Sequence, residues 1–142
     1  MTETKTVTVE RDFAHAPDKL WRALTQPHLI AEWLMKNDFA AEVGHKFNLS
    51  GEWGGTLDCE VLDIEPGELL SYRWDYSHED PAFDLRSVVT FTLTPTHGGT
   101  HLRMEQTGFR PDQPRAFGGA KHGWEQNFDK LEAVMAGISE ED

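Results

Sequence analysis

The feature that most constrains the fold is the order of two periodicities, a long β pattern followed by one amphipathic helix. From about Lys46 to Phe109, apolar residues recur at every second position in several short runs. Near the C-terminus they recur at steps of three and four, which gathers them along one stripe of a helix: Trp124, Phe128, Leu131, Val134 and Met135. A helix that follows a completed sheet covers the apolar face of that sheet. A packed core or a cavity then lies between them, and which of the two it is decides the function.

Two short helices are expected ahead of the main β pattern. Residues 6–10 alternate polar and apolar side chains, as a half-buried strand does. Pro17 suits the first position of a helix and Asp18 its positive end, and a second helical start follows at Pro27. Helices this short need a sheet to lie against. The order predicts an α+β fold, with about six antiparallel strands curved around the long C-terminal helix.

Length and cysteine content set the class of protein. The 142 residues predict a single domain over residues 1–142, with a core from about 6 to 136 that needs no disulfide. The single cysteine, Cys59, cannot form an internal bridge, which favours a reducing compartment. The N-terminus lacks the pattern of a signal peptide, and no apolar run approaches the ~20 residues of a membrane helix. We expect a cytoplasmic protein.

The net charge of −12 limits the possible partners. Nucleic-acid phosphates and anionic membrane surfaces would both be repelled, so neither is expected as a partner. The sequence also leaves open whether the first strand or a sheet edge pairs with a second copy, so both a monomer and a homodimer remain as alternatives.

Several short motifs follow one another along the chain: Ala16-Pro17 with Trp21, Ala23-Leu24-Thr25, Pro27 to Trp33, Val43 to Phe47, Val61 to Pro66, Leu69 to Trp74, Gly99 to Leu102, Thr107 to Phe109, and Gly123-Trp124. In this order they resemble the SRPBCC (START-related) superfamily, and most closely its homologues of the activator of heat-shock-chaperone ATPase. The resemblance implies a helix-grip fold, in which a curved sheet holds the C-terminal helix across an internal cavity. It does not imply one activity, because the superfamily includes ligand carriers, cyclases, hydrolases and co-chaperone-like domains.

Strand and helix parity selects the side chains that face the interior. Large aromatic residues meeting between a curved sheet and one helix can leave a gap, and ligand pockets are typically apolar and aromatic with a few polar groups. The alternative is that the same side chains simply fill a core. The candidate cavity residues are Trp53, Cys59, Tyr72, Trp74, Phe91, Met104, Gln106, Trp124 and Phe128.

Gln106 shares the parity of Leu102 and Met104, so its amide is expected to point inward. A ligand, a neighbouring protein group or a buried water would each satisfy this amide. The Tyr72 hydroxyl and the indole N–H groups also need partners if they are buried.

No catalytic residue, metal ligand or cofactor site is predicted. The sequence lacks a Gly-x-Ser-x-Gly elbow and a phosphate-binding glycine loop. Cys59 lies among apolar strand residues, where a thiol is inert. Asp75 and Asp84 are the best-placed acids, but no inward pair of carboxylates is evident. His97 and His101 flank a Gly-Gly turn at offset positions and lack a third converging ligand.

Residues 109–119 are predicted to form the loop before the C-terminal helix. Its two prolines stiffen it, while Gly118 and Gly119 permit movement. The segment is either an ordinary connection or a gate over the cavity. His122, at the expected start of the helix, faces either the cavity mouth or solvent.

Three functions follow from these observations. The first is binding of an apolar or aromatic small molecule between the sheet and Trp124 and Phe128. The second, from the resemblance, is a co-chaperone-like interaction protein that stimulates a heat-shock chaperone ATPase. The third is a cyclase- or hydrolase-type enzyme that uses Gln106 or Tyr72 to polarise a carbonyl group. We rank ligand binding first and catalysis last.

Overall fold

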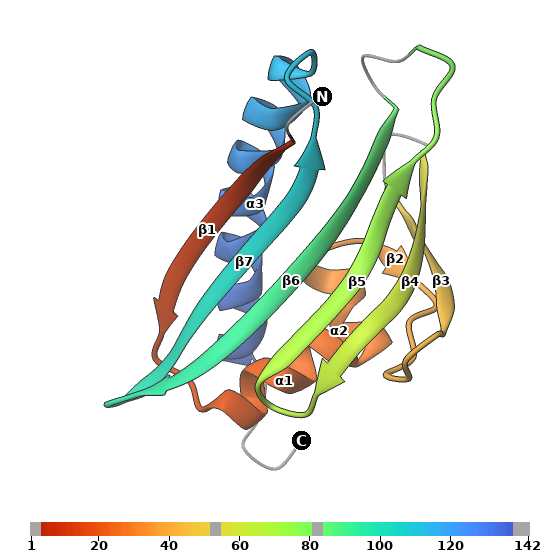
Figure 1. Cartoon of the computed structure of the whole chain (residues 1–142). Helices are drawn as coiled ribbons and strands as arrows, with labels where there is room; N and C mark the ends of the chain where they lie inside the picture. Colours follow the sequence, from red (N-terminus) through yellow and green to blue (C-terminus); the bar gives the residue numbers. More distant parts are fainter. Residues whose placement is uncertain (1–3, 52–54, 81–83, 138–142) are drawn as a thin grey trace.

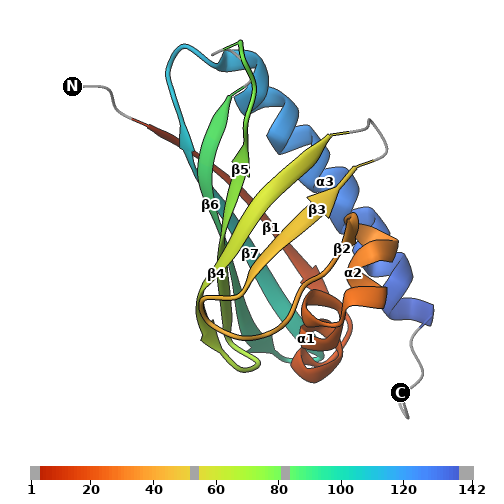
Figure 2. The same cartoon turned by 90° about the vertical axis from the view of Figure 1, so that its right-hand side faces the viewer.

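A computed structural model describes residues 4–51, 55–80 and 84–137. Its elements are β1 (Lys5–Phe13), α1 (Pro17–Thr25), α2 (Pro27–Trp33), β2 (Lys36–Asn37), β3 (Lys46–Ser50), β4 (Thr56–Glu65), β5 (Leu69–Tyr76), β6 (Leu85–Thr96), β7 (Gly99–Phe109) and α3 (Pro114–Gly137). The predicted α+β helix-grip fold is confirmed: one curved sheet lies on one side, and all three helices lie on the other (Figure 1, Figure 2).

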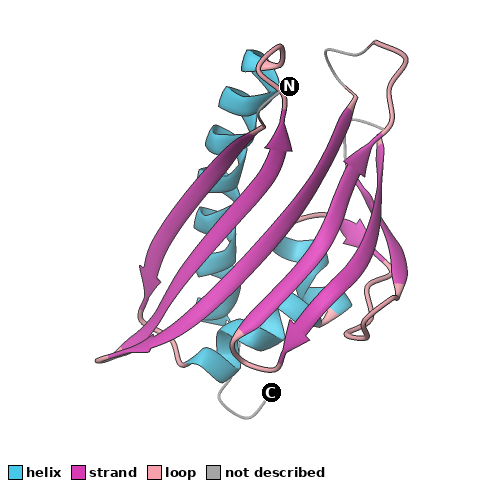
Figure 3. Ribbon diagram, viewed as in Figure 1, coloured by secondary structure: helices cyan, strands magenta, loops and turns pink. Residues whose placement is uncertain are grey.

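The sheet has seven strands in the order β1-β7-β6-β5-β4-β3-β2, and every neighbouring pair is antiparallel. Consecutive strands from β2 to β7 are neighbours, whereas β1 pairs with the last strand, β7 (Figure 3). The strand beyond the predicted six is β2, which pairs only Lys36 with Ser50 and Asn37 with Leu49. Two residues are too few to show an alternating pattern, so the sequence did not indicate this strand.

Local irregularities let the sheet curve around the helix. The register shifts between Val61 and Asp63 on β4 and between Lys5 and Thr6 on β1. Gly108, beside the second shift, has φ +132°, a conformation that favours glycine. Such bulges bend a strand and increase its twist, and the sheet accordingly wraps one face of α3 (Figure 2).

The two short helices begin as predicted and pack as a pair. Pro17 and Pro27 each open a helix, and Asp18 lies in the first turn of α1. The indole Nε1 of Trp33 donates a hydrogen bond of 2.8 Å to the Ala23 carbonyl, which fastens α2 to α1. Trp33 also meets α3 through the Trp124 ring, with 6.5 Å between centroids.

The side chains that strand and helix parity turned toward the interior are buried, both on the strands and on α3. All of the following are buried: Phe47, Leu49, Leu57, Cys59, Val61, Leu70, Tyr72, Trp74, Val89, Phe91, Leu93, Leu102, Met104, Trp124, Phe128 and Leu131. Trp53, predicted as a further member, lies outside the described residues.

The predicted loop of residues 109–119 is wrong over its second half. The connection between β7 and α3 spans only residues 110–113, and α3 begins at Pro114. Gly118 and Gly119 are therefore helical. Glycine disfavours a helix and this segment has few large apolar residues, so its helical period was hidden. His122 lies well inside α3 and is exposed.

Candidate functional site

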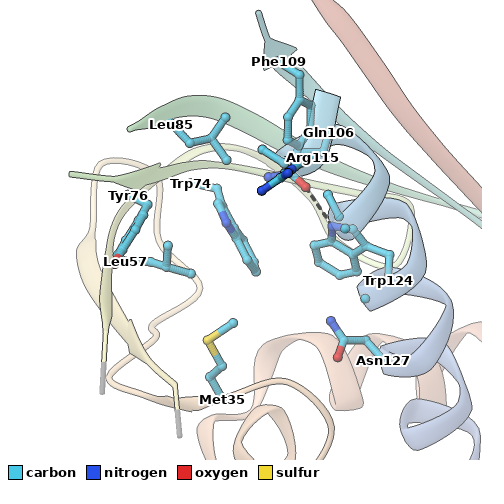
Figure 4. Close-up of a pocket in the computed structure, with 14 residues that line it drawn as sticks. Met35, Leu57, Trp74, Tyr76, Leu85, Gln106, Phe109, Arg115, Trp124 and Asn127 are labelled. Carbon is cyan, nitrogen blue, oxygen red and sulfur yellow. Dashed lines mark hydrogen bonds between the residues drawn. The ribbon is translucent and has the colours of Figure 1, made fainter. Parts of the chain in front are cut away.

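A cavity of about 550 Å³ lies between the sheet and the N-terminal half of α3 (Figure 4). Its sheet wall comes from β4 to β7, and Met35, just after α2, lines it from the helical side. The volume falls in the range of sites for small organic molecules. The sheet residues that line it are Leu57, Trp74, Tyr76, Leu85, Gln106 and Phe109.

The cavity exists because the inner face of α3 changes from large to small side chains. C-terminal to the cavity, Trp124, Phe128, Leu131 and Met135 are all buried against the core. N-terminal to Trp124, the residues at helical spacing on the cavity side are small: Ala116, Gly119, Ala120 and Gly123. A Cβ built on Gly119 or Gly123 would meet no heavy atom within 4 Å. The missing side-chain volume on this face is the space of the cavity.

Two tryptophans mark the inner end of the cavity, one from the sheet and one from the helix. The rings of Trp74 on β5 and Trp124 on α3 lie 5.2 Å apart between centroids, with an interplanar angle of 51°. Both side chains are largely buried, at 8% and 3% exposure. They present aromatic surface to the cavity, and beyond them the interior is filled by Phe91 and Phe128. An apolar ring bound in the cavity would pack on these two indoles.

A chain of buried hydrogen bonds holds the Trp124 side of the cavity in place. Trp124 Nε1 donates to Gln106 Oε1 at 2.8 Å, and Gln106 Nε2 donates to Ser87 Oγ at 3.0 Å. The Ser87 hydroxyl in turn donates to the Trp74 carbonyl at 2.6 Å. An indole N–H can only donate, so the Gln106 oxygen must face Trp124. These three hydrogen bonds connect α3 with β7, β6 and β5 and fix the orientation of the Trp124 ring.

Three polar groups at the cavity are available to a ligand. The indole N–H of Trp74 has no hydrogen-bond partner among the described residues. The amide of Asn127 and the guanidinium of Arg115 also line the cavity from α3 (Figure 4). The walls are otherwise mainly apolar, so these few groups would set the orientation of a bound molecule.

The nine predicted cavity residues divide into three groups. Trp74, Gln106 and Trp124 line the cavity. Five others are buried core residues and are not among its lining residues: Cys59, Tyr72, Phe91, Met104 and Phe128. The ninth, Trp53, lies outside the described residues.

Tyr72 and Phe91 belong to an aromatic cluster in the core rather than to the cavity wall. Their rings lie 5.9 Å apart, and Tyr72 also packs edge-on against Phe47 at 5.2 Å. Gln106 points inward as predicted, and its hydrogen-bond partners are two side chains, those of Trp124 and Ser87.

Sequence reasoning missed the small residues of α3 and, among the larger lining residues, Met35, Tyr76, Leu85, Arg115 and Asn127. Ala116, Gly119, Ala120 and Gly123 recur at steps of three, one and three, which is a helical stripe made of small residues. Treating residues 109–119 as a loop hid this stripe. Extending the helical period of Trp124 backwards along the chain would have revealed it.

Burial raises the pKa of two interior groups. The pKa of the Cys59 thiol rises to about 12, chiefly by desolvation, with further contributions from the Asp75, Asp58 and Asp38 carboxylates. Burial raises the pKa of Tyr72 well above its usual value, and Cys59 adds to this effect. Both groups are therefore neutral at pH 7, which agrees with the expectation that Cys59 is inert.

Asp75 and Asp84, the two acids considered in the sequence analysis, accept hydrogen bonds from backbone N–H groups and do not line the cavity. Burial raises the pKa of Asp75, which accepts a hydrogen bond of 3.2 Å from the Ser87 backbone N–H. Asp84 Oδ1 accepts a hydrogen bond from the His78 backbone N–H at 3.0 Å and lies 3.5 Å from Arg86 Nη2. Neither is a lining residue of the cavity.

Of the two histidines beside the Gly-Gly turn, His97 is exposed and His101 is paired with two carboxylates. His101, on β7, lies between two carboxylates of β1, with Nδ1 2.7 Å from Asp12 Oδ1 and Nε2 3.0 Å from Glu10 Oε1. These hydrogen bonds raise the pKa of His101. Within residues 4–51, 55–80 and 84–137, no group of three or more His, Cys, Asp or Glu side chains is placed to hold a metal ion. None of the helices in these ranges has the length and apolar character needed to cross a membrane.

The fold is that of a helix-grip protein of the SRPBCC superfamily. The family model described as activator of Hsp90 ATPase homolog 1-like protein matches residues 14–136, and the chain belongs to this family. A comparison with curated proteins finds no match.

Solved structures share this fold over most of the chain. Protein MLL2253 from Mesorhizobium loti is 69% identical, with a TM-score of 0.92 over 95% of this chain and 99% of that one. Protein BH1534 from Bacillus halodurans is 25% identical, with a TM-score of 0.78 over 95% and 99%. DynU16, a protein of the dynemicin biosynthetic locus, is 24% identical, with a TM-score of 0.80 over 93% of this chain and 47% of that one.

Proposed function

We propose that this protein binds an apolar or aromatic small molecule in the cavity between the sheet and the N-terminal half of α3. The observation that carries the proposal is the cavity of about 550 Å³ beside the Trp74 and Trp124 rings. A concave site of this size can bury most of the surface of a small ligand. Its aromatic walls and few polar groups are those of a small-molecule site.

The composition of α3 supports the same function. Each helical glycine costs roughly 1 kcal/mol of helix stability relative to alanine. Gly119 and Gly123 have room for a side chain, yet no side chain fills the cavity from these positions. Filling it would bury more apolar surface and would favour the helix. The open cavity is therefore maintained at a cost in stability, which a ligand-binding function would account for.

The test uses N-phenyl-1-naphthylamine, a neutral aromatic probe whose fluorescence rises in an apolar site. Two neighbouring glycines offer a matched pair of variants, since a Cβ added at either position would meet no heavy atom within 4 Å. Gly119→Leu places its side chain in the cavity, whereas Gly118→Leu places the same side chain on the exposed surface of α3. Thermal melting of both variants checks that they fold.

We expect the wild type and Gly118→Leu to bind the probe with similar affinity and Gly119→Leu to lose at least tenfold in affinity. Equal binding by the two variants would place the probe elsewhere and contradict the proposal. Absence of a fluorescence gain with the wild-type protein would contradict it as well.

A second candidate is stimulation of a heat-shock chaperone ATPase, which the family match over residues 14–136 favours. Its test is the rate of ATP hydrolysis by a purified Hsp90-type chaperone with and without a stoichiometric amount of this protein. An unchanged rate rejects this candidate. If the rate rises, Gly119→Leu separates the two functions, because filling the cavity leaves the outer surface intact.

A further inference from the structure

Arg115 is the one charged side chain among the described residues that line the cavity. It lies in the first turn of α3, one residue after Pro114, and Figure 4 shows it beside the cavity with Gln106, Trp74 and Trp124 nearby. The opposite wall carries no acidic side chain among the described lining residues. The cavity therefore has a positive charge at its edge and no negative charge of its own to balance it.

Two other arginines, Arg110 and Arg86, each have a carboxylate partner, whereas Arg115 has none among the described residues. Arg110 Nε lies 3.3 Å from Asp112 Oδ1, and Arg86 Nη2 lies 3.5 Å from Asp84 Oδ1. Arg115 has no carboxylate within 4.0 Å in the described part of the chain.

The surrounding side chains suit an amphipathic ligand. The Trp74, Trp124 and Phe109 rings form the apolar part of the cavity, and the Asn127 amide adds a neutral polar group on the same helix as Arg115. An arginine presents several N–H donors in a plane and forms paired hydrogen bonds with a carboxylate. Arg115 itself is exposed at the edge of the cavity, so its attraction for a carboxylate is expected to weaken at high salt.

We infer that the ligand is an aromatic acid, with its ring on the Trp74 and Trp124 indoles and its carboxylate on Arg115. This inference rests on the proposed binding function and adds the chemical class of the ligand. The net charge of −12 repels a free anion from the molecule as a whole. Arg115 supplies the local compensation that lets an acid enter.

The experiment compares 2-naphthoate with 2-naphthamide, which have the same ring system and nearly the same size but differ in charge. Each compound displaces N-phenyl-1-naphthylamine from the wild type, Arg115→Gln and Arg103→Gln at pH 7.5. Arg103 is a matched control, because it carries the same charge but lies on the outer face of β7 against Glu10 and Glu105. Affinities are measured at 0.05 M and 0.5 M NaCl.

For the wild type and Arg103→Gln we expect 2-naphthoate to bind about five- to tenfold more tightly than 2-naphthamide, with a smaller ratio at high salt. Arg115→Gln should reduce the ratio to one or below and leave the affinity for 2-naphthamide unchanged. Equal binding of the two compounds by the wild type, or an unchanged ratio in Arg115→Gln, overturns the inference while the cavity proposal stands. Failure of the neutral probe to bind overturns both.

Discussion

Gln106 joins the two walls of the cavity through its single side-chain amide. Its oxygen accepts from Trp124 on α3, and its nitrogen donates to Ser87 on β6. Both bonds are buried, and Gln106 itself is only 1% exposed. Removing the Gln106 amide would leave the Trp124 indole N–H without an acceptor. A buried donor without an acceptor lowers the stability by more than the net free energy of the hydrogen bond that is lost.

Gln106→Leu is therefore expected to lower the free energy of unfolding by about 1–2 kcal/mol. Urea denaturation followed by tryptophan fluorescence measures this change. The control is the double variant Gln106→Leu with Trp124→Phe, which removes donor and acceptor together. If the pair acts through the hydrogen bond, the double variant should lose less than the sum of the two single losses. Additive losses would show that the bond contributes nothing.

His101 is the residue for which the structure predicts a dependence of stability on pH. Its hydrogen bonds to Glu10 and Asp12 raise its pKa in the folded protein above the unfolded value of about 6.5. A raised pKa means that the folded state binds the proton more tightly. The stabilisation is therefore complete below about pH 6.5 and is lost as pH rises through the folded pKa.

We expect His101→Gln to lower the melting temperature at pH 5.5 and to have a smaller effect at pH 8.5. The side chain is 34% exposed, so solvent screening keeps the difference small. Thermal melts of both proteins at the two pH values measure it. The variant Glu10→Gln with Asp12→Asn removes the two carboxylates and should lose the same pH-dependent contribution. An effect of equal size at both pH values would contradict the assignment.

Among the elements, α3 has two halves with different roles. Its C-terminal half buries Phe128, Leu131 and Met135 in the core, and Arg11 of β1 reaches it through a 2.8 Å ion pair with Asp129. Its N-terminal half carries three glycines, Gly118, Gly119 and Gly123, and borders the cavity. With fewer buried contacts, the N-terminal half is the part of the helix expected to open first.

Replacing a glycine by alanine should raise the free energy of unfolding in α3 and lower it in β7. Gly118→Ala adds a methyl group to open space and favours the helix, so we expect a gain of about 0.5–1 kcal/mol in unfolding free energy. Gly108→Ala should destabilise by more than this, since φ is +132° and the new Cβ would collide with the Arg86 carbonyl oxygen on β6. Urea denaturation of the two variants measures both effects, and shifts of the same sign would contradict the comparison.

In the whole molecule, the first strand, β1, and the last helix, α3, complete the fold. β1 pairs with β7, and α3 packs on the face that the strands enclose (Figure 1). One cluster of buried side chains runs from Val7 on β1 to Met135 on α3. Exposing a residue in the middle of this cluster therefore requires a large part of the fold to open.

The reactivity of the Cys59 thiol measures this opening, because the residue is 5% exposed and burial raises its pKa to about 12. The raised pKa keeps the thiol almost entirely un-ionised at pH 8 in the folded state. We expect its reaction with Ellman's reagent to be slow in buffer and fast in 6 M guanidinium chloride. The control moves the single cysteine to a surface position by Cys59→Ala with Val43→Cys, since Val43 is 60% exposed. Fast reaction of native Cys59 would contradict the burial.

The sequence alone predicted most of the sheet and little of the cavity. Alternation along β3 to β7 identified the inward face, since a strand sends successive side chains to opposite sides. It also placed Trp74, Gln106 and Trp124 correctly on inward faces. It did not separate these three from Tyr72, Phe91 and Met104, which share the same parity. Parity tells which way a side chain points and nothing about what it meets.

What the sequence determined by itself was local and periodic: the strand faces, the two helix starts at Pro17 and Pro27, and the stripe from Trp124 to Met135. These depend on backbone geometry that each segment carries with it. Only the tertiary structure decided that the small residues from Ala116 to Gly123 lie opposite the Trp74 end of the sheet and leave about 550 Å³ open. A cavity is a difference in volume between elements far apart in the chain, so it exists only once they have packed.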